Sequence, residues 1–402
     1  DSVARTQKTF KFNLIAMAVV SAMTVMAAER VNAQQVTAKG GCNYYDLTSS
    51  TPKEVSCSPE LSNPEGKGVK APADTSVNGI SVNVFPDTVL SIGGSTIGLG
   101  AHSTINNGGT LDTKSSYNGY GMSAGVNNRS TEGGNTFNNS IGVLDENGDP
   151  ITVPGTIITG GINAHGMYVN AKQSEAANSI TNRGSVTTTG KQADGIRLYT
   201  ESTTPGDSIE NIGTITTSGE DASGIHVQNT QTVTTIRNSG TITVNDKSGY
   251  GIYIEGAANV INSGTITADP TGYAIYVKDN GNTKATTVTL SGDDVDITGA
   301  LEFNTTLTSE KLVFEGTGSE VTPFAFNNDI TGLNIIELDG ANVTMGSTNG
   351  YDLVDGEINV GSSAELKVAG NITGTGGLTK NGEGTLRLSG TNTYAGDTRV
   401  DQ

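Results

Sequence analysis

Two short phrases decide the fold of this chain, Gly195-Ile-Arg-Leu198 and Ile209-Glu-Asn-Ile-Gly-Thr-Ile-Thr216. Both return along the middle of the sequence, always in the same order. Copies of the first phrase begin 29, 29, 27 and 23 residues apart, at Gly166, Gly195, Gly224, Gly251 and, in degenerate form, Ala274. The asparagines of the second phrase recur at nearly the same spacing, at Asn182, Asn211, Asn238 and Asn262. Two phrases that share one period indicate a stack of similar units rather than a single globular core.

The spacing inside the first phrase predicts strands. Side chains on a strand point alternately to its two faces, so residues two apart share a face. One face is apolar in every copy, at Met167/Val169, Ile196/Leu198, Ile225/Val227, Ile252/Ile254 and Ile275/Val277. Helical repeats need apolar spacings of three and four and few glycines, and a propeller blade needs four strands in about 40 residues. A period near 27 fits three short strands, so we expect an all-β chain folded as a right-handed parallel β-helix.

The Asn-x-Gly of the second phrase allows two interpretations. Both residue types tolerate a left-handed backbone, which favours a turn at this point. Alternatively, the asparagines stack inside the coils as an amide ladder, each hydrogen-bonded to the next. We expect the turn.

The composition suits such a stack and excludes some partners. The 402 residues include 54 glycines and no tryptophan, and only 34% are hydrophobic. That share is low for a globular core, but a solenoid needs only a narrow apolar strip in each coil. The net charge of -18 disfavours nucleic acid as a partner.

The first residues have the features of a signal peptide. Basic residues precede an apolar run from Leu14 to Ala28, which is shorter than the roughly 20 residues that a membrane span needs. We expect residues 1–33 to be removed by cleavage after Ala33, leaving Gln34 first. Residues 34–78 are polar and are expected to form an N-terminal cap or lead. In an exported chain, the pair Cys42 and Cys57 predicts a disulfide.

The end of the chain resembles a known family. Gly377-Leu-Thr-Lys380, Gly384-Thr-Leu386, Leu388-Ser-Gly390 and Asn392-Thr-Tyr394 are similar to the passenger-associated repeat of Gram-negative autotransporters, which use type V secretion. The resemblance implies a β-helical passenger over 79–370, an incomplete transport repeat over 371–402 and a C-terminal β-barrel translocator, for which this chain has no room. We therefore expect a fragment of a larger protein. The resemblance also implies export through the periplasm to the cell surface or the medium, and a role in virulence.

No catalytic, cofactor or metal residues are expected. Gly121-Met-Ser-Ala-Gly125 matches a hydrolase elbow, but the residues after it do not have a helical pattern. Asp145-Glu-Asn-Gly-Asp149 resembles the start of a calcium loop, yet Pro150 and Thr156 stand where the loop needs Gly and Glu. A polysaccharide lyase or serine protease on the same rod remains the alternative to a non-enzymatic passenger.

One outward position of the repeat suggests a binding surface. If the coils align, its residues form a line along the rod: Tyr168, Arg197, His226, Tyr253 and Tyr276. Tyr and Arg are favoured in recognition surfaces, although an ordinary ladder of packed outward side chains has the same pattern. We expect adhesion or self-association, with a host-cell surface protein, a glycan or copies of the chain as partners. An inert stalk for a functional region elsewhere is a further alternative.

Overall fold

The computed structural model describes residues 39–48, 53–63, 66–71, 77–114, 116–125, 133–171, 176–201, 203, 206–229 and 231–401. The expected cleavage site at Ala33 and Gln34 lies outside these residues. The described part contains strands and turns, without a helix.

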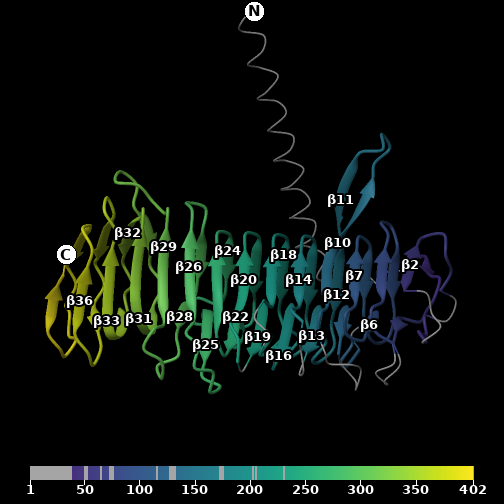
Figure 1. Cartoon of the computed structure of the whole chain (residues 1–402), viewed down its shortest axis with the longest axis horizontal. Coiled ribbons are helices and arrows are strands. Elements are labelled where there is room, and N and C mark those ends of the chain that lie inside the picture. The colour runs from purple at the N-terminus through teal and green to yellow at the C-terminus, as the bar shows by residue number, and fades with distance from the viewer. Residues whose placement is uncertain are drawn as a thin grey trace, which may run out of the picture. The chain divides into compact units, whose positions relative to one another are not determined.

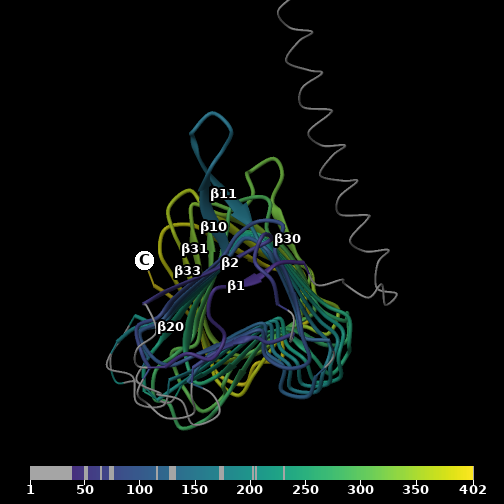
Figure 2. The same ribbon diagram turned by 90° about the vertical axis from the view of Figure 1, so that its right-hand side faces the viewer.

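Three short strands make each coil of the stack. One coil contains β13 (Met167–Ala171), β14 (Ser179–Asn182) and β15 (Ser185–Thr188). The next contains β16 (Ile196–Thr200), β17 (Ser208–Asn211) and β18 (Thr214–Thr217). Each strand pairs in parallel with its counterpart one coil away, so Met167 lies beside Ile196 and Asn182 beside Asn211. The expected right-handed parallel β-helix is confirmed (Figures 1 and 2).

The remaining strands extend these three columns. Strands in line with β13 are β3 (Val69–Lys70), β6 (Ile97–Leu99), β9 (Met122–Ala124), β19 (Ile225–Asn229), β22 (Tyr250–Glu255), β25 (Tyr273–Lys278), β28 (Ala300–Glu302) and β35 (Ile372–Thr373). Strands in line with β14 are β2 (Glu54–Ser58), β4 (Ser81–Val84), β7 (Thr104–Asn107), β10 (Thr136–Leu144), β20 (Thr234–Asn238), β23 (Ala258–Asn262), β26 (Thr287–Ser291), β29 (Lys311–Glu315), β36 (Leu378–Asn381) and β38 (Thr398–Val400).

The column of β15 and β18 contains β5 (Val89–Ser91), β8 (Thr110–Asp112), β12 (Thr156–Thr159), β21 (Thr241–Val244), β24 (Thr265–Thr267) and β27 (Asp296–Thr298). Further along the chain, a separate sheet takes over, with β30 (Phe324–Phe326), β32 (Asn342–Met345), β34 (Glu365–Val368) and β37 (Thr385–Leu388). The long strands β31 (Ile330–Asp339) and β33 (Tyr351–Val360) bend across the first two columns.

The apolar face of the repeat forms the core. Ile196, Ile225 and Ile252 are fully buried and lie in register from coil to coil. The glycine that opens each copy allows this close packing. A Cβ on Gly195 would lie 2.3 Å from Cγ2 of Ile215 and 2.7 Å from the carbonyl oxygen of Gly224. At Gly195, therefore, no space remains for a side chain, whereas the copy that opens with Ala274 lies where the register of the next pairing shifts.

The asparagines of the second phrase stack inside the coils, so the expectation of a turn alone was wrong. Each Nδ2 donates to the Oδ1 of the next asparagine at 2.7–2.9 Å, through Asn107, Asn139, Asn182, Asn211, Asn238 and Asn262. All six are buried. The Asn-x-Gly segment does form a corner between two strands, and Asn182 Oδ1 accepts the N–H of Gly184. Neither residue takes a positive φ, however.

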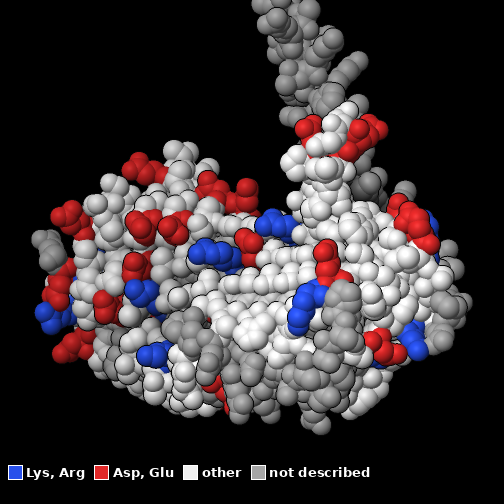
Figure 3. Space-filling view, turned by 45° about the vertical axis from the view of Figure 1, so that its right-hand side comes forward, with Lys and Arg blue, Asp and Glu red and all other residues white. Residues whose placement is uncertain are grey.

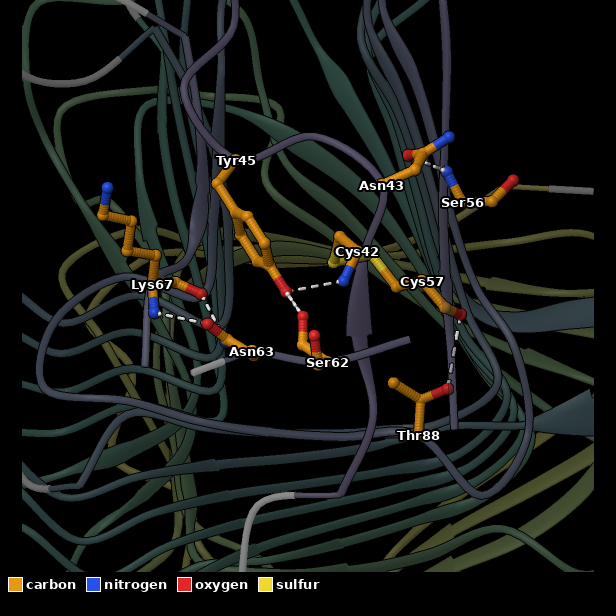
Figure 4. Close-up of a disulfide and its surroundings, with 9 residues drawn as sticks. All are labelled: Cys42, Asn43, Tyr45, Ser56, Cys57, Ser62, Asn63, Lys67 and Thr88. Atoms are coloured by element: carbon orange, nitrogen blue, oxygen red, sulfur yellow. Dashed lines mark hydrogen bonds between the residues drawn. A yellow bond between two sulfur atoms is a disulfide. The ribbon is translucent and has the colours of Figure 1, made fainter. Parts of the chain in front are cut away.

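The described chain begins with a disulfide-linked pair of strands. β1 (Gly41–Cys42) runs antiparallel to β2, and Cys42 is joined to Cys57 across them (Figure 4). The Tyr45 hydroxyl accepts the N–H of Cys42 and donates to the carbonyl of Ser62. Parallel pairing starts at once, because β2 already lies beside β4. The coils thus begin near Glu54, upstream of residue 79, where the alternating pattern first becomes clear in the sequence.

One hairpin projects from the stack. β10 continues beyond its parallel partners and turns back as β11 (Pro150–Pro154) (Figures 1 and 2). At the tip, Asp145 Oδ1 accepts the N–H groups of Asn147 and Asp149. The segment that resembles a calcium loop is therefore a hairpin turn held by its own aspartate. Figure 3 shows acidic side chains at the end of this projection.

Candidate functional site: a polar groove along the coils

The five residues of the expected ladder do lie in one line. Tyr168 pairs with Arg197, Arg197 with His226, His226 with Tyr253, and Tyr253 with Tyr276. The guanidinium carbon of Arg197 lies 6.0 Å from the centre of the Tyr168 ring. The ladder is less exposed than an outward position suggests. His226 is only 7% exposed, and the other four side chains are half-buried.

Four of the five residues form one wall of a groove of about 550 Å³, namely Tyr168, Arg197, His226 and Tyr253, whereas Tyr276 does not line it. The turn that precedes each strand folds up beside it and makes the opposite wall. The residues that line the groove occupy three positions in each copy of the first phrase: three residues before the opening glycine, one residue before it and two residues after it. The position one before supplies Tyr120, His165, Asp194 and Tyr250, and the position three before supplies Asn118, Asn163, Gln192, Asp221 and Ser248. Glu255 completes the lining.

A buried carboxylate organises the middle of the groove. Asp194 Oδ2 lies 3.1 Å from Nδ1 of His226 and 3.4 Å from a terminal guanidinium nitrogen of Arg197. Its other oxygen accepts the N–H of Ser223 at 2.8 Å. Burial is the largest single influence on Asp194 and raises its pKa. The combined effect of His226, His165 and Arg197 is stronger, so the pKa of this carboxyl is held below its usual value.

His165 lies beside the same carboxylate but is neutral. Burial lowers the pKa of His165 to about 3, and Arg197 and His226 add to this effect against the opposing charge of Asp194. Its Nδ1 accepts the N–H of Asp194 at 3.0 Å. A nitrogen that accepts a hydrogen bond carries no proton, so the 3.4 Å approach of Nδ1 to Asp194 Oδ2 is not an ion pair. The proton of this ring is therefore on Nε2.

The tyrosines form a packed cluster at the other end of the groove. Tyr253 contacts His226 and Tyr250 with ring centres 4.5 and 4.8 Å apart, and Tyr250 contacts Tyr276 at 4.9 Å. The Tyr253 hydroxyl donates to Glu255 at 2.6 Å. Burial, followed by this hydrogen bond, raises the pKa of Tyr253. The ring faces are thus largely occupied by one another, and the groove offers hydroxyl groups and ring edges.

The turn wall has an unusual backbone conformation. Asn118, Asn163, Gln192 and Asp221 have φ values of 50°, 55°, 55° and 57°, in the left-handed region that non-glycine residues seldom adopt. The N–H of Asn163 donates to the carbonyl of Lys191, and that of Gln192 to Glu220, each one coil further on. The walls therefore keep the same register as the sheet, and their side chains recur at about 4.8 Å, the spacing of neighbouring strands.

Sequence reasoning missed His165, Asp194 and Asn163 as members of the site. A signal was present, because each occupies a fixed offset from the repeat glycine. These offsets hold different residue types in different copies, which is also the pattern of ordinary solvent-facing positions. Only the folding of the turn against the strand makes them a common surface.

The other candidates from the sequence do not form a reactive site. Ser123 of the Gly-x-Ser-x-Gly match is fully buried in β9, where its hydroxyl donates to the carbonyl of Ile97. Within the described residues, no three His, Cys, Asp or Glu side chains are grouped to hold a metal ion. In the same part of the chain, no helix is long and apolar enough to span a membrane.

Comparison with known proteins supports the resemblance at the end of the chain. Residues 378–402 match the family described as Passenger-associated-transport-repeat. The resemblance to autotransporter passengers is confirmed. The chain is also 45% identical over 75 residues to the Adhesin BmaC autotransporter of Brucella suis biovar 1 (strain 1330). This match covers 17% of the chain and 2% of the Brucella protein, so the chain spans a small part of that relative. No solved structure matches the chain.

Proposed function

We propose that this chain is part of an autotransporter passenger that is displayed on, or released from, a Gram-negative cell and mediates adhesion. The observation that carries the proposal is the 45% identity over 75 residues to a protein named an adhesin. The transport repeat at residues 378–402 supports the route of export. In the complete protein, an outer-membrane translocator would carry the passenger to the surface.

The geometry is consistent with contact rather than catalysis. Stacked coils present the same positions again and again along one face, which suits binding spread over several sites. The groove collects a His–Asp contact, but the unpaired Nε2 of His226 has less than 1 Å² exposed to solvent. Ser123, the serine of the hydrolase-like match, is fully buried in β9 and does not line the groove, so we favour binding over the alternative of a polysaccharide lyase or serine protease. An inert stalk gives no role to a groove that contains a buried carboxylate, that of Asp194.

Cell attachment tests this proposal. The gene product as encoded is expressed in a non-adherent Gram-negative host, and display is verified with an antibody against the chain. We expect displayed cells to attach to host cells, or to clump, more than cells carrying the empty vector. Added purified chain should compete with this attachment. Verified display without attachment or clumping above the vector control contradicts the proposal.

A further inference from the structure

The groove contains hydrogen-bonding groups that the protein itself does not use. Within the described residues, the side-chain amides of Asn118, Asn163 and Gln192 make no hydrogen bond, and they line one wall in successive coils. Each amide offers both a donor and an acceptor. A row of such groups, repeating at about 4.8 Å, matches a ligand that presents donors and acceptors at a similar interval.

The opposite wall has buried polar atoms without partners. Nε2 of His226 and Nε of Arg197 are both buried and make no hydrogen bond in the described structure. Only 7% of His226 is exposed to solvent. Its Nε2 lies 3.9 Å from Glu255 Oε1, which is beyond hydrogen-bond distance. A buried polar atom without a partner is unfavourable, so its presence beside a groove indicates that small shifts on binding bring a partner to it.

The charge of the groove restricts the ligand. Asp194, Asp221 and Glu255 face it, against one arginine, Arg197, among the lining residues. The whole chain carries a net charge of -18. Sulfated or sialylated ligands would be repelled by this site.

The sheet beside the groove does not favour an extended peptide. β16 lies between β13 and β19, and β19 lies between β16 and β22, so their backbone groups are already paired on both sides. A peptide that binds by adding a strand needs a free edge, and this face has none along these strands. A small apolar contact is available at one end of the groove, where Tyr117 and Ile162, the residues before Asn118 and Asn163, are 67% and 48% exposed.

We propose that this groove binds an uncharged glycan whose sugar rings lie along the coil axis. The side-chain amides of Asn118, Asn163 and Gln192 contact the hydroxyl groups of the sugar rings. The cluster of Asp194, Arg197 and His226 fixes the orientation of the glycan. Tyr117 packs against a terminal sugar ring. The coils repeat at ~4.8 Å, so successive sugars of an extended glycan meet equivalent positions of successive turns. This inference rests on the proposed adhesive function and names the ligand class for it.

Glycan binding by the purified full chain tests the inference. The probes are immobilised neutral oligosaccharides of glucose, galactose and N-acetylhexosamines, with sialylated glycans, heparin and unmodified peptides in parallel. The test variant is the double substitution Asn163→Gly and Gln192→Gly. Both residues have positive φ, which glycine adopts freely, so the variant loses two amides without backbone strain. The matched control is Ser363→Gly, an exposed residue with φ 65° outside the groove.

We expect binding to at least one neutral glycan, weakened at least tenfold by the double variant and unchanged by Ser363→Gly, because two hydrogen bonds to the ligand are lost. Failure to bind any neutral glycan, a preference for heparin, sialylated glycans or peptides, or equal affinity of the double variant overturns the inference. The outcome is separable from that of the adhesive function. If displayed cells attach but the double variant attaches equally well, adhesion stands and the glycan groove does not. If neutral glycans bind through the two amides while displayed cells do not attach, the groove stands and adhesion does not.

Discussion

Asp194 and His226 belong to different coils, yet Oδ2 of Asp194 lies 3.1 Å from Nδ1 of His226. The residue in line with Asp194 in that next coil is Ser223, three residues before His226, and its N–H donates to the other carboxylate oxygen. One buried side chain therefore links its own strand, through Arg197, to the following coil.

Replacing this carboxylate should destabilise the middle of the stack. Asp194→Ala leaves the Ser223 N–H, Arg197 and His226 without their acceptor in a buried site, and we expect a loss of about 3–5 kcal/mol. Chemical unfolding followed by circular dichroism measures the loss. Glu220→Ala is the control, because Glu220 is an exposed residue that pairs with Lys191, and its loss should change the unfolding midpoint little. Equal effects of the two variants would contradict the assigned role of Asp194.

The amide ladder should be sensitive at each step. Asn211→Ala removes the acceptor for Asn182 Nδ2 and the donor to Asn238 Oδ1, both inside the core. We expect a loss of about 2–4 kcal/mol, because two buried polar groups lose partners and a cavity forms. The exposed Asn259→Ala should change the unfolding midpoint little. A neutral Asn211→Ala would show that the ladder does not contribute to stability.

Gly195 should not tolerate a methyl group. In Gly195→Ala the new Cβ would overlap Ile215 and the backbone of Gly224, and we expect a loss of about 3 kcal/mol or more. Gly142→Ala provides the control, since no atom lies within 4 Å of a Cβ at that position in the projecting hairpin. The comparison uses thermal unfolding. If Gly195→Ala unfolds at the same temperature as the wild-type chain, the coils are less closely packed than described.

Stability should fall with rising pH because of one buried acid. Glu310 is fully buried, and burial raises the pKa of its carboxyl to about 8, although the N–H of Thr286 donates to Oε2 and acts in the opposite direction. The unfolded chain ionises this group near its usual 4.5, whereas the folded chain keeps the proton until about pH 8. Its contribution is therefore complete below pH 4.5 and is lost as the pH rises toward 8.

Glu310→Gln should remove this dependence. At pH 7 the variant should be more stable than the wild-type chain by on the order of 3 kcal/mol, and the difference should vanish near pH 4.5. Unfolding midpoints measured from pH 4.5 to 8 check both limits. The exposed Glu315→Gln should leave the profile unchanged. Parallel profiles for wild type and Glu310→Gln would show that Glu310 is ionised in the fold.

The fold could be read from the sequence because its signal is repeated. Ile196, Ile225 and Ile252 occupy the same inward position in copy after copy, and alternation on a strand fixes their common direction. The asparagines were harder, since Asn182 does two things at once: its Oδ1 closes the local corner and its Nδ2 reaches the next coil. Local propensity reveals only the first.

The groove could be predicted only in part. The register between coils alone brings Tyr168, Arg197 and His226 into line, and the spacing of the repeated phrase in the sequence predicts this alignment. Their burial was not, because it depends on the turn containing Gln192 and Asp194 folding over the strand. Asp194 gave no sign of being buried, since its counterparts in other copies are His165, Ser223 and Tyr250. A position that changes so freely resembles a solvated one.

The asparagine ladder has a direction. In all five links from Asn107 to Asn262, the donor belongs to the earlier residue and the acceptor to the later one. The amide dipoles therefore point the same way along the stack and polarise one another, as in any chain of aligned hydrogen bonds. Flipping one amide would place its nitrogen against the nitrogen of one neighbour and its oxygen against the oxygen of the other. The whole row is therefore held in a single orientation. The rod has an electrical polarity inside its apolar core that its outer surface does not reveal.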